Sequence, residues 1–146
     1  MADIVTQRNI GGYITGLTSA YPQSSAAATV TGVSIDRQAH GMPLSCTMHT
    51  AVGAVGGAPT TTSVVTTLQH APDNSTWTTY QPDGVNNATA TAITAATSDS
   101  ELDVDLTLAY RYIRTSTVVG FTGGTSPTVL FDTKIVVGGE SYQPAI

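Results

Sequence analysis

The side chains of this chain best suited to hold a transition metal are its three histidines, His40, His49 and His70. Histidine ligands of one metal ion are commonly two or four residues apart, so that a single strand or helix presents both. None of the three histidines has that spacing. The neighbouring residues place His40 in a loop, His49 within a strand and His70 at the end of another. The sequence therefore favours structural roles for these side chains, and no metal site is predicted.

Four carboxylates recur at every second position, at Asp99, Glu101, Asp103 and Asp105. In a strand they would share one face, where their oxygens could bind calcium. The same pattern is typical of a solvated strand face, and the central glycine and terminal glutamate of an EF-hand loop are missing. We expect a solvated face, and calcium binding remains the alternative.

The chain offers no recognisable nucleophile. Its one cysteine, Cys46, rules out an intramolecular disulfide and lies in an alternating segment, which is typical of a small buried hydrophobic residue. No serine lies in a G-x-S-x-G elbow. We therefore expect no catalytic residues and no cofactor, and the sequence indicates a protein that is not an enzyme.

Aromatic side chains could form a platform on which a sugar ring stacks. The candidates are Trp77, Tyr80, Tyr110 and Tyr112. Trp77 follows a turn rich in Asp and Asn, and the last two tyrosines alternate along a strand-like stretch. Such positions are more often used for packing in the core and at its edge, so packing is the favoured interpretation.

The stretch that must position several of these residues is 101–120, the longest with a strand-like pattern. Val104, Leu106, Leu108, Tyr110 and Tyr112 occupy alternate positions and polar residues the others, which predicts a half-buried strand. A glycine-rich loop follows. Residues 128–137 alternate in the same way, so we expect the two strands to pair antiparallel as a closing hairpin.

Further strands are predicted at 29–35, 44–52 and 61–70, with a return strand starting near Trp77 and a weak one at 88–94. Residues 1–28 read as an N-terminal arm with a short edge strand near 13–17, and 138–146 as a C-terminal tail. The domain between them, 29–137, is expected to be all-β. Its many short strands indicate an antiparallel β-sandwich or a jelly-roll-like barrel.

The composition narrows the range of partners. The chain has 146 residues, enough for one domain, with a net charge of -5 and 10% charged residues. It has no basic patch for nucleic acid, no signal-peptide core at its start and no apolar run long enough to cross a membrane. Threonine and serine supply 38 residues and lysine only one. A surface so poor in charge favours a protein covered in part by neighbouring subunits.

Two patches resemble small virion proteins of tailed bacteriophages. The first is VVTTLQHAPDNSTWTTY at residues 64–80, a strand, a turn and a tryptophan. The second is YRYIRTSTV at residues 110–118, followed by a glycine-rich turn and TVLFDTKIVVGG. Together they cover about a third of the chain, and they are similar to the capsid-associated proteins called decoration or cement proteins.

This resemblance implies a β-sandwich or jelly-roll-like body on the outer surface of an assembled head. Its partners would be the major capsid protein and further copies of the chain, often in a homotrimer that staples adjacent capsomers. The protein would be made in the host cytoplasm and located on the capsid surface of the virion. The structural and interaction residues are then Trp77, Tyr110, Arg111, Tyr112 and Arg114. We expect Arg114 to pair with an acid or a carbonyl at an oligomer interface.

Two alternatives to decoration remain open at this point. A tail tube or head-tail connector subunit would also be small and rich in strands. A glycan-binding module would use Trp77 and the tyrosines as its stacking platform.

Overall fold

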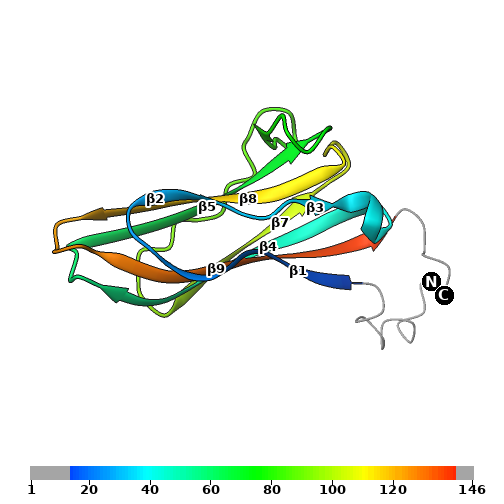
Figure 1. Cartoon of the computed structure of the whole chain (residues 1–146). Coiled ribbons are helices and arrows are strands. Elements are labelled where there is room, and N and C mark those ends of the chain that lie inside the picture. Colours follow the sequence, from blue (N-terminus) through cyan, green and yellow to red (C-terminus); the bar gives the residue numbers. More distant parts are fainter. Residues whose placement is uncertain (1–13, 141–146) are drawn as a thin grey trace.

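The computed structural model describes residues 14–140, which form two antiparallel sheets packed face to face (Figure 1). The first sheet has the order β1 (Ile14–Ser25), β9 (Thr128–Glu140), β4 (Pro43–Gly56) and β7 (Ser98–Asp105). The second has the order β2 (Ala28–Thr31), β8 (Tyr112–Thr122), β5 (Thr61–Ala71) and β6 (Thr78–Thr79), with β3 (Ile35–Asp36) also pairing with β8. Within the described range the one helix is the short 3₁₀ turn η2 (Arg37–His40). The predicted all-β sandwich is confirmed.

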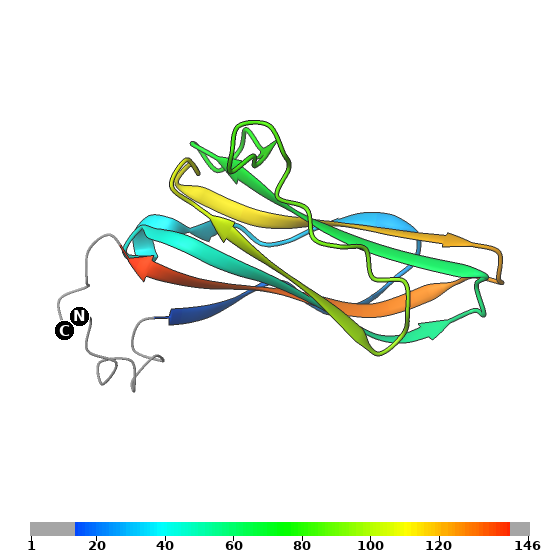
Figure 2. The same ribbon diagram turned by 180° about the vertical axis from the view of Figure 1, so that it is seen from behind.

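The body is elongated, and its long strands run between two opposite ends (Figures 1 and 2). At one end lie the start of β8 and the connections 72–77 and 106–111. At the other end lie residues 57–60, which join β4 to β5, and residues 123–127, which join β8 to β9. The segment predicted as a weak strand at 88–94 makes isolated bridges from Thr89 and Ile93 to β5, so it covers part of that strand's edge.

The strands form where β-branched residues alternate between a buried and a solvated face. Along β5, Thr62, Val64, Thr66 and Leu68 are buried, while the residues between them are partly exposed. The same alternation orients β4, where Cys46 faces the core as predicted and Met48 faces it as well. Because the side-chain period is two, this pattern also fixes the register between neighbouring strands.

A layer of threonines divides the interior into two apolar halves. On β4, β5, β8 and β9 one or two threonines separate an apolar residue of one half from an apolar residue of the other. This threonine layer consists of Thr50, Thr66, Thr115, Thr117 and Thr133. The half toward the start of β8 contains Met48, Leu68, Ile113 and Ile135, and the other contains Val52, Val64, Val119 and Phe131.

Hydrogen bonds within the threonine layer join the two sheets. The Thr50 hydroxyl donates to that of Thr66 over 2.7 Å, and Thr115 and Thr133 bond over 2.9 Å. Each bond connects the first sheet to the second. Since a buried hydroxyl without a partner is costly, these pairs fix how the sheets face each other as well as holding them together.

The expected single strand at 101–120 is wrong, because this stretch contributes to both sheets. β7 ends at Asp105, whose carboxylate accepts from the backbone N–H of Thr107, and a connection leads across to β8. Val104 and Leu106 are buried, but Leu108 is 63% and Tyr110 50% exposed. In β8 the buried residues are the odd-numbered ones from Ile113 onward, so the predicted alternation shifts by one residue.

The expected closing hairpin is also wrong. β8 pairs with β5 in one sheet and β9 pairs with β4 and β1 in the other, so residues 123–127 cross between the sheets. β9 alternates as predicted, and β8 also alternates, with its buried face shifted by one residue. The hairpin was expected because strands that follow each other along the chain usually pair. In a sandwich, consecutive strands can instead pack face to face through their buried sides.

The described part of the expected N-terminal arm is a strand of the sandwich. β1 has 12 residues and pairs along β9 from Ile14 to Ser25, so it is longer than the short edge strand expected near 13–17. β9 continues to Glu140, into the expected tail. The rest of the arm and tail, 1–13 and 141–146, lies outside the described residues. Within residues 14–140, no helix has the length and apolar character needed to cross a bilayer.

Candidate interaction surface

All five residues expected to carry structure or interaction lie at one end of the sandwich. We call this the aromatic end and define it by Trp77, Tyr110, Arg111, Tyr112 and Arg114. Trp77 precedes β6, Tyr110 and Arg111 lie in the connection 106–111, and Tyr112 and Arg114 begin β8. They meet because β8 pairs with β5, which brings Arg114 opposite Gln69 and Tyr112 opposite Ala71.

Arg114 lies over the face of the Trp77 ring, with its guanidinium carbon 4.1 Å from the ring centroid. Its Nε donates to Oε1 of Gln69 over 2.9 Å, which fixes the guanidinium above the indole. Within the chain, Arg114 therefore contacts an amide and an aromatic face. Its expected pairing with an acid or a carbonyl at an oligomer interface stays a prediction. A cation over an indole at a partly exposed site stabilises by about 0.5–2 kcal/mol. Among residues 14–140, no acid forms an ion pair with Arg114.

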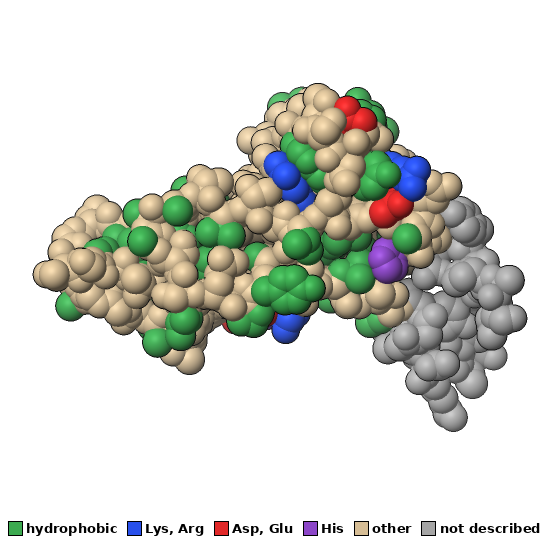
Figure 3. All heavy atoms as spheres, in the orientation of Figure 1, with side chains coloured by type: hydrophobic (Ala, Val, Ile, Leu, Met, Phe, Trp, Pro, Cys, Tyr) green, Lys and Arg blue, Asp and Glu red, His purple; other side chains and the backbone are tan. Residues whose placement is uncertain are grey.

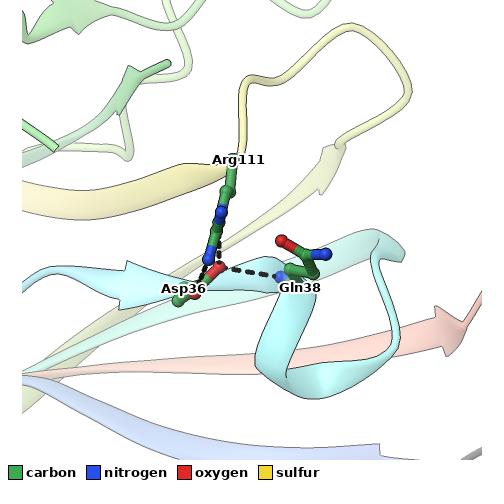
Figure 4. A network of polar contacts seen from close by, with 3 residues as sticks. All are labelled: Asp36, Gln38 and Arg111. Atoms are coloured by element: carbon green, nitrogen blue, oxygen red, sulfur yellow. Dashed lines mark hydrogen bonds and ion pairs between the residues drawn. The ribbon is translucent and has the colours of Figure 1, made fainter. Parts of the chain in front are cut away.

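Arg111 forms a two-pronged ion pair with Asp36 (Figure 4). Its Nε and its terminal nitrogen donate to the two carboxylate oxygens over 2.9 and 2.7 Å. The backbone N–H of Gln38 donates to the same carboxylate and caps η2. The bonds from Arg111 hold the pKa of Asp36 below its usual value. Because the pair is largely solvated, it positions the connection 106–111 more than it stabilises the fold.

His70 and Tyr110 stack at the outer rim of the aromatic end. Their ring centroids are 4.4 Å apart with an interplanar angle of 22°, and Tyr80 packs against His70 from the core side. Nδ1 of His70 accepts from the backbone N–H of Tyr110 over 3.1 Å. Burial, with a smaller effect from nearby Arg37, lowers the pKa of His70. A neutral imidazole therefore fits this contact, since a protonated ring could not accept the bond.

Arg37 anchors the aromatic end from within. Its guanidinium is 2% exposed and donates to four backbone carbonyls, those of Pro43, Leu106, Ala109 and Tyr110, over 2.5–3.1 Å. No carboxylate bonds to it within the described range, and its Nε has no partner there. Burial lowers the pKa of this guanidinium. The charge is balanced by carbonyl dipoles, and the bonds pull the connection 106–111 onto the body.

Sequence reasoning missed Arg37, Asp36 and His70 as parts of this end. Asp36 had a usable signal, because Asp before a short helical turn is a preferred cap. His70 was predicted to end a strand, and it does. Its stacking partner Tyr110 lies 40 residues further along the chain, so no local pattern indicated the contact. A buried arginine has no local signature, and the carbonyls that bind Arg37 come from two segments, Pro43 and the connection 106–111.

The tyrosines and the tryptophan have different roles. Tyr80 is 1% exposed and its hydroxyl donates to the carbonyl of Asp105, so the packing interpretation is confirmed for this residue. Tyr110 and the neighbouring Leu108 are at least half exposed. Trp77 is partly buried. The exposed apolar and aromatic groups of this end are of the kind that make the strongest contributions in protein interfaces.

The opposite end differs in chemistry. We call it the glycine end and define it by residues 57–60 and 123–127. These two segments are joined by a backbone hydrogen bond, in which Thr125 N–H donates to the carbonyl of Gly57 over 2.9 Å. Three glycines there have positive φ, Gly57, Gly123 and Gly124. The segments 52–68 and 115–131 contain no charged residue. In Figure 3 the charged side chains visible on this face lie toward the aromatic end or the middle of the body.

Two open grooves mark the outer face of the first sheet. One is lined by residues that include Ile14, Leu44 and Val136, and the other by residues that include Pro22 and Leu130. Cys46 lies beneath the first groove, but its thiol is buried and burial raises its pKa to about 12. A neutral buried thiol is a poor nucleophile, so this groove is suited to contact rather than to reaction.

The predicted solvated face is confirmed for the carboxylates of β7. Asp99, Glu101, Asp103 and Asp105 are all exposed and alternate with the less exposed residues of the strand. Of the histidines, His40 lies in η2 and His70 at the aromatic end. The structure also places His49 of β4 beside this face, which the spacing of histidines along the sequence could not reveal.

No protein-family model and no curated protein matches the chain. Among solved structures, it is similar to the PBSX exported protein XepA with 16% identity and a TM-score of 0.55, over 94% of this chain and 41% of that one. The SPBc2 prophage-derived protein YomS matches with 17% identity and a TM-score of 0.45, over 86% and 93%. A structure of infectious bursal disease virus, Gt strain, matches with 15% identity and a TM-score of 0.46, over 90% and 33%.

The likeness to XepA is one of fold. This chain spans less than half of that protein, and at 16% identity the comparison concerns the arrangement of strands. The two sheets therefore form a sandwich of a kind found in XepA. At the level of the fold, this agrees with the resemblance expected from the sequence.

Proposed function

We propose that the protein is a non-enzymatic structural protein of a tailed-phage virion, which binds the outside of the head and bridges capsid subunits. The observation that carries this proposal is the gathering of Trp77, Arg114, Tyr110 and Leu108 at one end of a stiff sandwich. The sequence resemblance to decoration proteins supports the same role. The major capsid protein is then the partner, and the aromatic end is the surface that contacts it.

The composition of the aromatic end suits a protein interface. Tryptophan, tyrosine and arginine are the residues most often found at the centre of interfaces, where they bury large areas with little loss of side-chain freedom. Arg114 is already held above Trp77 by Gln69, so binding would not need to order it. Such preorganisation favours affinity because less conformational entropy is lost on association.

The rest of the body suits a bridge between fixed points. The hydrogen-bonded threonine layer ties the two sheets together in mid-body, which resists shear between them. β1 begins and β9 ends at the aromatic end (Figures 1 and 2). A body and arms that reach two or three capsid subunits gain effective concentration, and each contact can then be weak.

Co-sedimentation tests the proposal directly. Purified protein is mixed with undecorated heads assembled from the phage's own major capsid protein, and bound protein is measured in the pellet. We expect saturable binding that Trp77→Ala and Arg114→Ala each weaken by about tenfold, as for residues at the centre of an interface. Tyr21→Ala is the matched control, because Tyr21 is 64% exposed and lies in β1 away from the aromatic end. Absence of binding by the unaltered protein would refute the proposal.

Mass in solution separates decoration from the tail alternatives. We expect a homotrimer of about 45 kDa, three times the 15.0 kDa of the chain. A tail tube or connector subunit would form rings or tubes without the head. Light scattering after gel filtration distinguishes these states.

Glycan binding is the second candidate, favoured by the partial exposure of Trp77. Arg114 covers one face of that ring, which leaves the other for a sugar. A glycan array that gives a signal abolished by Trp77→Ala would support this candidate over decoration. An array without signal would remove it.

A further inference from the structure

A histidine and two carboxylates meet on the outer face of the first sheet. His49 lies on β4, and its register partner across to β7 is Glu101, while Asp99 pairs with the neighbouring Ala51. All three side chains point to the same face because their positions differ by even numbers along each strand. β4 is hydrogen-bonded to β9 on one side and to β7 on the other, so the backbone beneath His49 is held from both sides.

The potential ligand atoms are close enough to share one ion. Nε2 of His49 lies 2.9 Å from Oδ2 of Asp99, and one ligand atom from each of the three residues lies within 4.8 Å of the others. Ligands at about 2.0–2.1 Å from a tetrahedral zinc ion are roughly 3.4 Å apart. The side chain of Asp99 is 61% exposed, and Glu101 is also exposed, so small rotations of both reach that geometry.

Among residues 14–140, no lysine or arginine forms an ion pair with this cluster. Asp103 accepts from the hydroxyl of Thr47, and Asp105 from Thr107, so those two carboxylates have local donors. The carboxylate of Glu101 has no hydrogen-bond or ion-pair partner among the described residues. The one lysine, Lys134, lies across from His49 on β9 but bonds to Asp132 over 3.4 Å. Four like charges along one edge strand therefore face solvent with little compensation.

We propose that His49, Asp99 and Glu101 form a binding site for a divalent transition metal, with zinc as the ion that fits them best. Zinc accepts a mixed set of imidazole nitrogen and carboxylate oxygens, and three protein ligands leave one position for water. Calcium prefers six to eight oxygen ligands, so the imidazole and the small number of carboxylates disfavour it here. The site lies on the sheet face, separate from the aromatic end, and does not depend on the proposed function.

Isothermal titration of the untagged protein with zinc chloride tests the site. We expect one zinc ion per chain, and an increase in Kd of about tenfold or more in His49→Gln and in Glu101→Gln. Because both residues lie on the outer face, the variants should keep the unaltered protein's far-ultraviolet circular dichroism. His40→Gln is the matched control, since His40 lies in η2 and outside the cluster.

Three outcomes would overturn the site. One is that zinc does not bind the unaltered protein. Another is that zinc binds equally well to the unaltered protein and both variants, and the third is that His40→Gln weakens binding as much as His49→Gln. A parallel titration with calcium chloride sharpens the assignment, because tighter binding of calcium than of zinc would also contradict it.

Discussion

The two ends of the sandwich are closed by different means. At the aromatic end, side chains hold the connections: Arg37 donates to four carbonyls, and Tyr80 and Asp36 fix neighbouring segments. At the glycine end, the backbone holds the connections, through glycines at positive φ and a hydrogen bond between residues 57–60 and 123–127. The first arrangement presents arginine and aromatic groups to the surroundings, whereas the second presents small uncharged ones.

From this difference we expect separate roles for the two ends, one in stability and the other in binding. A closure made from backbone needs no large side chain and offers little for a partner to recognise. A closure made from side chains requires polar and aromatic groups, and some of these remain partly exposed and preorganised. We therefore expect changes at the glycine end to alter stability alone, and changes at the outer rim of the aromatic end to alter binding.

Replacing the anchor of the aromatic end should have the largest effect. Arg37→Ala removes the donors of four backbone carbonyls, two of them in fully buried bonds, and leaves a cavity, so we expect a loss of about 4 kcal/mol or more in the free energy of unfolding. Urea denaturation followed by Trp77 fluorescence measures it. Arg111→Ala is the control, because that arginine is solvated and should cost far less. Equal losses would contradict the role given to Arg37.

Next in size is a substitution at the glycine end. Gly124 has φ +82, and an added Cβ would lie 2.6 Å from the carbonyl oxygen of Gly57, so Gly124→Ala should destabilise by about 2–3 kcal/mol. Gly84→Ala is matched, with φ +75 but open space around it, and should cost about 1 kcal/mol. Thermal unfolding compares the two. Gly124→Ala protein that has folded should still bind heads. If the folded variant does not bind, the glycine end contributes to binding, which would contradict the separate roles expected for the two ends.

The threonine layer joins the two sheets between the two ends, and its hydroxyls can be removed one at a time. Thr66→Val keeps the shape but leaves the hydroxyls of Thr50 and Thr117 without a shared partner, so we expect a loss of about 1–2 kcal/mol. Thr67→Val changes the adjacent residue on the outer face, where it removes only an exposed hydroxyl bond to Thr89, and should stay within about 0.5 kcal/mol. Chemical denaturation of both variants is the measurement. No difference between them would mean that the layer acts only by filling space.

The smallest expected effect is a pH dependence at the rim of the aromatic end. The pKa of His70 is lowered by burial, so the unfolded chain takes up a proton at higher pH than the folded one. The stabilisation should be complete above the usual pKa of 6.5 and should decline as pH falls from there toward the lowered folded value. Thermal unfolding between pH 7.5 and 5 should show this slope, and His70→Asn should flatten it. A slope unchanged in His70→Asn would exclude His70 as its source.

Much of the fold follows from local pattern. The strands at 44–52, 61–70 and 128–137 were predicted within a few residues, because threonine and valine alternate there between a buried and a solvated face. What the pattern could not give was the pairing. Alternation says which face of a strand is buried, and both β8 and β9 satisfy it whether they lie side by side or face to face.

The candidate site was predictable in its residues and not in its arrangement. Trp77, Arg111 and Arg114 were selected from the sequence through the resemblance to decoration proteins. Their grouping depends on the pairing of β8 with β5, which is a long-range contact. Arg37 could not be selected, since nothing near it in the sequence distinguishes a buried arginine from a solvated one. His49 and Glu101 are 52 residues apart, and only the register of β4 and β7 brings them together.

Electron microscopy of heads saturated with the purified protein tests the central claim most directly. We expect an elongated two-sheet body on the outer surface of the head, with its aromatic end against the capsid subunits. Each bound assembly should contact more than one capsid subunit. Density in the tail or connector, contact through the glycine end, or bare heads at saturating protein would contradict it.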